Sequence, residues 1–175
     1  MTDVLTRRPA ATAEPRRIQR FVRSLRYGAL LAPVGVLAMA DAIVGEEETA
    51  ARRLGMRPAG SARAFGYGLL TAVLGLASWF VMVLAVLAVV RGPFWGFVEH
   101  GPVEPGTWGG PTRAGAWAAH GLIAVPCLAV FLAVLRGISA LHRLLVEGSR
   151  RWVLPATIVV AVGSLAFFWS WLQQL

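Results

Sequence analysis

The sequence contains no lysine, only one cysteine and few charged residues. Of its 175 residues 15% are charged and 57% are hydrophobic, and the mean hydropathy is +0.62. These values lie outside the range of water-soluble domains and predict an integral membrane protein. The lone Cys127 excludes a disulfide framework and a cysteine-based zinc site, and its place in an apolar run indicates a small packing residue.

Because lysine is absent, the net charge of +8 comes from arginine alone. So basic a soluble chain would suggest a nucleic-acid partner. Here, however, the arginines stand beside apolar segments, where arginine sets membrane topology and contacts anionic lipid headgroups. We therefore expect no nucleic-acid partner, and a lipid bilayer with anionic headgroups as the surroundings.

Three stretches are long and apolar enough to cross a bilayer. Residues 66–90 contain no charge and would extend about 37 Å as a helix, against a hydrocarbon core of about 30 Å. Residues 114–135 are interrupted only by His120, and residues 152–172 carry tryptophans near their ends, as membrane-interface positions often do. We predict three spanning helices.

The first apolar segment, residues 27–44, differs from these three. Its uncharged part ends at Asp41 after about 21 Å of helix, and it contains Pro33. We expect a short interfacial or re-entrant helix, with a fourth span as the alternative. A basic start followed by an apolar run and Ala38-x-Ala40 also resembles a cleaved signal peptide.

The arginine distribution bears on these alternatives. Seven arginines precede Tyr27 and four lie between residues 52 and 63, whereas the loop 91–113 has only its two end residues and 136–151 has four. Arginine-rich flanks remain cytoplasmic, which places the N-terminus inside and the loop 91–113 outside. A fourth span, or a signal peptide cleaved after Ala40, would place an arginine-rich segment on the outer face.

The expected fold is all-α: an integral membrane helical bundle forming one membrane domain, residues 27–175. A basic tail, residues 1–26, is expected to be disordered because of its composition. Residues 45–65 form a cytoplasmic linker that contains a short exposed helix, for which Gly55 is the expected terminating residue.

Two features of the predicted spans concern packing. Gly68, Ala72 and Gly75 share one helical face, which permits close approach of another helix. Packing within the chain is the favoured interpretation, and a homodimer is the alternative. Pro126 removes a backbone donor and should kink the second span.

Beyond Leu135 the helical periodicity continues into an amphipathic extension. One side carries Ile138 and Leu145, and the other carries Ser139 and His142. This pattern is typical of a cytoplasmic helix that lies against lipid headgroups, as an anchor or as an output element.

Sequence motifs of catalysis are absent. The chain has no nucleophile elbow, phosphate loop, kinase motif or zinc-binding helix, and its spans hold almost no ionisable groups. His120 and His142 would lie about 33 Å apart on one helix, too far to share a metal. We expect no enzyme activity, no cofactor and no metal site.

The loop between the first two predicted spans holds most of the polar residues that could meet a ligand. Its glutamates and histidines could bind a cation, a peptide or a headgroup, although an ordered connector with interfacial tryptophans is the favoured interpretation. The candidate extracytoplasmic sensing residues are Trp95, Glu99, His100, Glu104, Trp108 and His120.

A Trp-Gly-Gly-Pro turn stands at 108–111, a Gly-Ala-Trp-x-x-His run at 115–120, and Arg-Gly and Leu-His-Arg sequences within 136–143. Through these motifs, residues 63–145 resemble the sensor membrane domain found at the N-terminus of many actinobacterial histidine kinases. The resemblance implies a non-catalytic multi-helix module of a bacterial cell membrane that detects an envelope or membrane signal. No phosphoacceptor or ATP-binding domain follows Arg143, so the signal would pass to a separate partner.

The expected function is therefore a sensor-like membrane module with a signalling kinase or another regulator as its partner. The alternative is an accessory subunit that packs against a transporter or permease.

Overall fold

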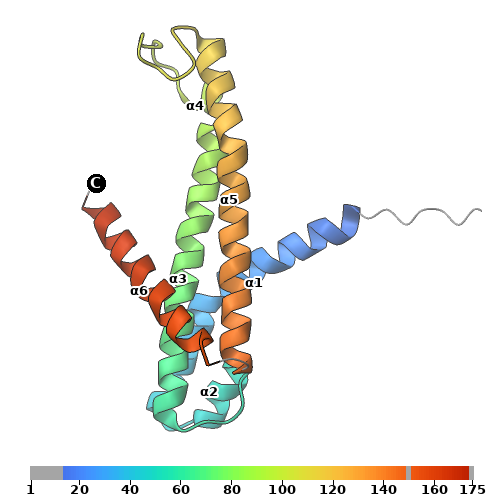
Figure 1. Ribbon diagram of the computed structural model, residues 1–175, viewed down its shortest axis with the longest axis vertical. Helices are drawn as coiled ribbons and strands as arrows, with labels where there is room; N and C mark the ends of the chain where they lie inside the picture. Colours follow the sequence, from blue (N-terminus) through green and yellow to red (C-terminus); the bar gives the residue numbers. More distant parts are fainter. Residues whose placement is uncertain (1–13, 149–150, 174–175) are drawn as a thin grey trace, which may run out of the picture.

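The computed structural model describes residues 14–148 and 151–173, which contain six helices and no strand. The helices are α1 (Glu14–Ile43), α2 (Glu47–Leu54), α3 (Ser61–Arg91), α4 (Trp95–Val98), α5 (Arg113–Glu147) and α6 (Val153–Leu172). The antiparallel α3 and α5 form a long central hairpin, with α4 near one end and α2 near the other (Figure 1). The all-α helical class is confirmed.

Within residues 14–148 and 151–173, four helices are long and apolar enough to cross a membrane. These candidate spans are Val22–Ile43, Ser61–Arg91, Arg113–Glu147 and Val153–Ser170. The predicted segments 66–90, 114–135 and 152–172 correspond to the last three of them. The first candidate span covers the segment that the sequence left open.

Helix α1 differs from the prediction for both of its parts. It runs without interruption from Glu14 to Ile43, so residues 14–26 of the predicted disordered tail are helical, whereas residues 1–13 lie outside the described residues. Residues 27–44 do not form a short re-entrant element, because the chain does not reverse before Ile43. Instead this part of α1 is a full member of the bundle.

Two side-chain contacts explain why α1 continues where the sequence suggested an end. Pro33 lacks the N–H that would bond to the carbonyl of Ala29, and the indole Nε1 of Trp79 on α3 donates to that carbonyl at 2.9 Å. Asp41 forms a 2.5 Å ion pair with Arg53 of α2. Both the freed carbonyl and the charge are thus satisfied by neighbouring helices.

Small residues bring α1 and α3 into backbone contact. A β-carbon at Gly75 would lie 2.5 Å from the Cα of Ala32, and one at Gly35 would lie 2.6 Å from the carbonyl oxygen of Gly68. Neither side tolerates a larger residue at these positions without separation of the helices. The face formed by Gly68, Ala72 and Gly75 therefore packs within the chain, and a second copy could use it only by displacing α1.

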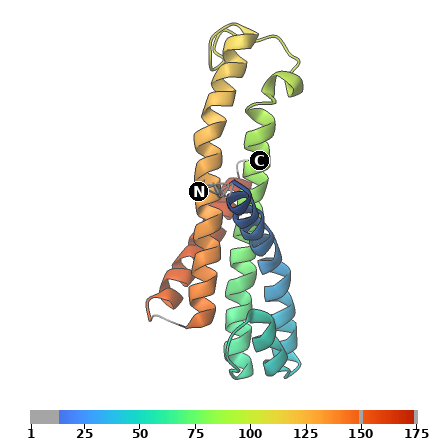
Figure 2. The same cartoon turned by 90° about the vertical axis from the view of Figure 1, so that its right-hand side faces the viewer.

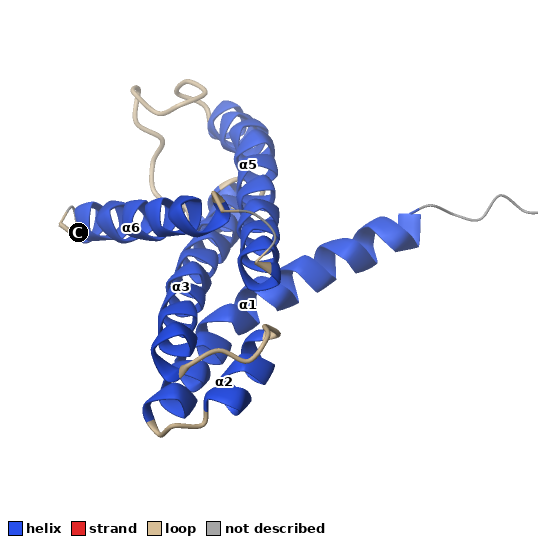
Figure 3. Cartoon of the chain, turned by 60° about the horizontal axis from the view of Figure 1, so that its bottom comes forward, coloured by secondary structure: helices blue, strands red, loops and turns tan. Residues whose placement is uncertain are grey.

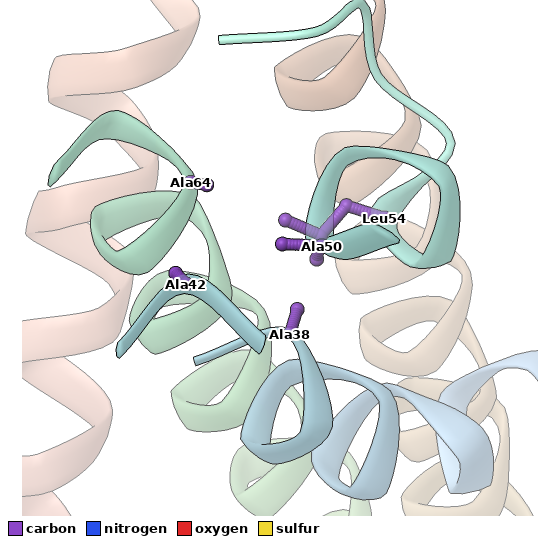
Figure 4. Close-up of a cluster of buried hydrophobic side chains, with 5 residues drawn as sticks. All are labelled: Ala38, Ala42, Ala50, Leu54 and Ala64. Atoms are coloured by element: carbon purple, nitrogen blue, oxygen red, sulfur yellow. The ribbon is translucent and has the colours of Figure 1, made fainter. Parts of the chain in front are cut away.

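The linker 45–65 is less exposed than predicted. Figure 4 shows buried Ala50 and Leu54 of α2 beside Ala38 and Ala42 of α1 and Ala64 of α3, and these residues form one apolar cluster. Gly55 ends α2 with φ of +71°, as expected of a terminating glycine. Helix α2 thus fastens the α1–α3 turn instead of forming a solvated connection.

Helix α5 continues through Pro126 as one helix of 35 residues. The sequence predicted Ser139 and His142 on an exposed polar side of its last turns, and this prediction is wrong. Both side chains are buried together with Leu135, Ile138 and Leu145, because this stripe packs against α1 and α3. Arg136 and Arg143 occupy the exposed side.

The helices are offset along the bundle axis. Gly28 of α1 lies against Ser78, near the middle of α3, and the half of α1 before it projects away from the bundle (Figures 1 and 2). At the α4 end, Gly92 lies against Ala124 of α5. Helix α1 therefore covers only the first half of α3.

Helix α6 crosses the bundle at an angle (Figure 3). Its main aromatic contacts are Phe167 and Phe168, which meet the ring of Phe80 edge to face at centroid distances of 6.0 and 5.7 Å. Most of its other large apolar side chains are exposed, as expected of a helix that faces lipid.

Candidate functional site

An aromatic and basic cluster closes the α4 end of the hairpin; we name it the loop-end cap. It consists of Trp95 and Phe97 from α4 and Arg113, Trp117 and His120 from α5. The ring of Trp95 stacks on His120 with centroids 4.9 Å apart and planes 17° apart. The guanidinium carbon of Arg113 lies 6.0 Å from the centroid of Trp95, within cation–π range.

Hydrogen bonds lock the start of the loop onto α5. Arg113 donates to the backbone carbonyls of Gly96 and Glu99, at 2.9 Å for Gly96. The indole of Trp117 donates to the carbonyl of Pro93 at 2.7 Å. A β-carbon at Gly96 would lie 2.6 Å from Cδ2 of the Trp117 ring, so this close packing requires glycine.

The Trp-Gly-Gly-Pro turn has a structural role in starting α5. The side chain of Thr112 caps the helix by accepting from the backbone N–H of Gly115 at 3.1 Å. Gly109 has φ of +94°, and a β-carbon there would lie 2.8 Å from the Cα of Ala116. Gly109, Gly115, Trp117 and His120 therefore all help to shape the loop-end cap.

The six predicted sensing residues do not form one site. Trp95 and His120 come together, while Glu99 supplies a backbone carbonyl to Arg113. His100, Glu104 and Trp108 are exposed, and His100 bonds to the backbone carbonyl of Val98. Over residues 14–148 and 151–173, no three His, Cys, Asp or Glu side chains are grouped to hold a metal.

One ring nitrogen of His120, Nε2, remains available to bind a ligand. Its Nδ1 lies 2.7 Å from the carbonyl of Ala116, an acceptor, so Nδ1 carries the proton. In the neutral ring Nε2 then holds the lone pair. The cap can thus offer a ligand an aromatic face, a guanidinium and one imidazole acceptor.

A second polar cluster lies at the opposite end of α5; we name it the three-helix node. The Nδ1 of His142 lies 2.7 Å from the hydroxyl of Tyr27 on α1, and its Nε2 lies 3.0 Å from Oγ1 of Thr71 on α3. Thr71 donates its own proton to the carbonyl of Tyr67 at 2.7 Å. Thr71 therefore accepts from Nε2–H of His142, and Tyr27 donates to Nδ1.

The node is buried and joins three helices that are far apart in sequence. His142 is 4% exposed and Thr71 is fully buried. A buried neutral imidazole with both nitrogens bonded fixes the rotation of α5 against α1 and α3. Sequence reasoning missed this site, although His142 shares helical spacing with the apolar Leu135, Ile138 and Leu145.

Comparison of the chain with family models, curated proteins and solved structures finds no match in any of the three. The resemblance to a sensor membrane domain therefore rests on the sequence motifs alone.

Proposed function

We propose that this chain is a non-catalytic, sensor-like module of the cell membrane that relays a change at the loop-end cap to a separate partner. The observation that carries the proposal is the continuity of α5. Its first turns hold Arg113 and His120 of the cap, and its last turns hold His142 of the three-helix node. One helix of about 52 Å thus joins the two polar clusters.

The two ends of α5 are restrained in different ways. At the cap, α5 is tied to loop backbone by Arg113 and Trp117, and a ligand that reorients Trp95 would act on these bonds. At the node, rotation of His142 changes its fit to Tyr27 and Thr71. A ligand with differential affinity for two cap arrangements would therefore shift the position of α1.

For orientation, we propose that the N-terminus and α2 are cytoplasmic and that the cap is outside. The arginine-containing segments 52–63 and 136–148 lie toward the α2 end of the hairpin, in agreement with the positive-inside rule. The seven arginines before Tyr27 favour the cytoplasmic side for the N-terminus as well.

The projecting half of α1 is the element that we assign to a partner, with a signalling kinase as the expected class. It leaves the bundle just beyond Tyr27, so movement at the node alters its direction. The accessory-subunit alternative was based on the uncharged helices and on the small-residue face of α3. Helix α1 fills that face, so a permease would have to pack against other apolar surfaces of the bundle.

A distance measurement between spin labels tests the relay. In a Cys127→Ser background, labelled cysteines replace the exposed Val22 on α1 and Val134 on α5. We expect His120→Ala to shift or broaden the distance distribution between the labels, because it removes the stacking partner of Trp95. Trp108→Ala is the matched control, since Trp108 is 71% exposed and should leave the distribution unchanged.

One result would contradict the relay. If the distributions of the parent and of His120→Ala coincide while the variant shows altered tryptophan fluorescence, the cap has changed and α1 has not responded. Sensing through α5 would then be wrong.

A further inference from the structure

A groove of about 410 Å³ lies between α1, α2 and α5, beside the three-helix node. Its volume falls within the usual range for ligand sites. Most of the lining is apolar, and this part consists of Leu30, Leu31, Val34, Leu54 and Val146. Its charged lining residues are Arg53 of α2 and Arg143 and Glu147 of α5. A ligand that fits must therefore have both an apolar and a charged part.

Arg53 and Arg143 differ in the partners that their guanidinium groups already have. Arg53 already pairs with Asp41 through Nε at 2.5 Å. The Nε of Arg143 donates to the carbonyl of Ser139 at 3.2 Å, and its guanidinium lies 5.9 Å from the ring centroid of Tyr27. Both contacts of Arg143 are to uncharged groups, and neither uses its terminal guanidinium nitrogens. Those nitrogens remain suited to a bidentate anion such as a phosphate.

An apolar strip leads out of the groove along α1. Leu30 lines the groove at its end away from Asp41 and is 49% exposed, and Val34 lies one turn nearer to Asp41 on the same helical face. In a helix that is apolar enough to cross a membrane, such a strip meets lipid acyl chains.

We propose that this groove binds one anionic phospholipid. The phosphate lies between Arg143 and Arg53, and an acyl chain lies against Leu30, Leu31 and Val34 of the groove. Basic pockets between membrane helices at the cytoplasmic side are suited to such headgroups. Glu147 at the rim opposes the anion and sets a limit on affinity. The bound lipid would fill the space between α1 and α5 beside Tyr27 and hold these helices together.

Native mass spectrometry of the purified full chain tests the proposal. The detergent-solubilised protein is mixed with equal amounts of phosphatidylglycerol and phosphatidylcholine, and the lipid retained on the protein is counted. We expect one phosphatidylglycerol retained in preference to phosphatidylcholine. Arg143→Gln should lower that retention about fivefold, as expected from loss of one cation near an anionic headgroup. Glu147→Gln should raise it.

Arg136→Gln is the matched control, because Arg136 is exposed on α5 two turns away and does not line the groove. It should retain the lipid, and Arg143→Lys should retain more than Arg143→Gln. Helix content and gel-filtration volume establish that each variant is folded. Equal losses in Arg136→Gln and Arg143→Gln would overturn the site in favour of diffuse attraction. Equal retention of phosphatidylcholine, or displacement of the lipid by inorganic phosphate, would overturn an anionic lipid as the occupant.

Discussion

The hydroxyl of Tyr27 donates to Nδ1 of His142 across 2.7 Å, although 115 positions separate the two residues in sequence. Tyr27→Phe removes the donor and leaves a buried ring nitrogen without its partner. We expect the free energy of unfolding in detergent micelles to fall by about 1 to 3 kcal/mol.

Tyr67→Phe is the matched control for this change, because Tyr67 is partly buried against the apolar cluster of α1, α2 and α3. Its loss of a hydroxyl should cost less. If both variants unfold alike, the hydrogen bond of Tyr27 contributes nothing specific.

Contact between α1 and α3 depends on glycine. Gly75→Ala would place a methyl group 2.5 Å from the Cα of Ala32, and we expect a loss of about 1 to 3 kcal/mol from overpacking. Gly66→Ala on the same helix meets nothing within 4 Å and should stabilise the helix by about 0.5 to 1 kcal/mol. Opposite signs are the expected result of denaturant titrations, and a stable Gly75→Ala protein would contradict the packing.

The bond from Trp79 to Ala29 should matter only because Pro33 is present. Trp79→Phe removes the donor to the carbonyl that Pro33 leaves free, with an expected cost of about 1 to 3 kcal/mol. In a Pro33→Ala background, residue 33 can donate to Ala29 within the helix. The cost of Trp79→Phe should then fall, and a double-mutant cycle measures the difference. Equal costs in both backgrounds would mean that the indole acts through packing alone.

Cysteine labelling in intact cells tests the proposed orientation. Single cysteines at Gln19, Gly60 and Glu104 are placed in the Cys127→Ser background, and all three positions are exposed. We expect an impermeant reagent to label position 104 alone. Labelling of positions 19 and 104 together would show that α1 crosses the bilayer. Labelling of position 60 would show that α2 is outside, the reverse of the proposed orientation.

The sequence predicted the parts of the fold that depend on local composition. Uncharged runs located α3, α5 and α6, and Gly55 located the end of α2. Residues 14–26 of α1 were predicted to be disordered because of their basic composition, and Pro33 and Asp41 suggested that the rest of α1 is interrupted. Their compensating partners, Trp79 and Arg53, belong to other helices, which no local pattern reveals.

The loop-end cap and the three-helix node were likewise only partly predictable from local sequence patterns. Trp95 and His120 were both among the candidate residues, but their stacking depends on how α4 folds back onto α5. His142 was assigned to a polar face together with Ser139. Its actual partners, Tyr27 and Thr71, lie 115 and 71 positions away. Amphipathic spacing alone does not show which side of a helix is buried, because burial also depends on where the neighbouring helices lie.

The axial offset between α1 and α5 has a consequence for the surrounding lipid. The apolar part of α1, residues 27–40, lies beside the first half of α3, whereas the uncharged part of α5, residues 114–135, lies beside the second half and beyond. Placed end to end, these parts cover about 54 Å, well above the roughly 30 Å of a hydrocarbon core. The α1 side and the α5 side of the protein therefore present their apolar surfaces at unequal depths. A flat, uniform bilayer fits only one side at a time, so the protein should tilt or pucker the adjacent leaflet and partition with membrane thickness.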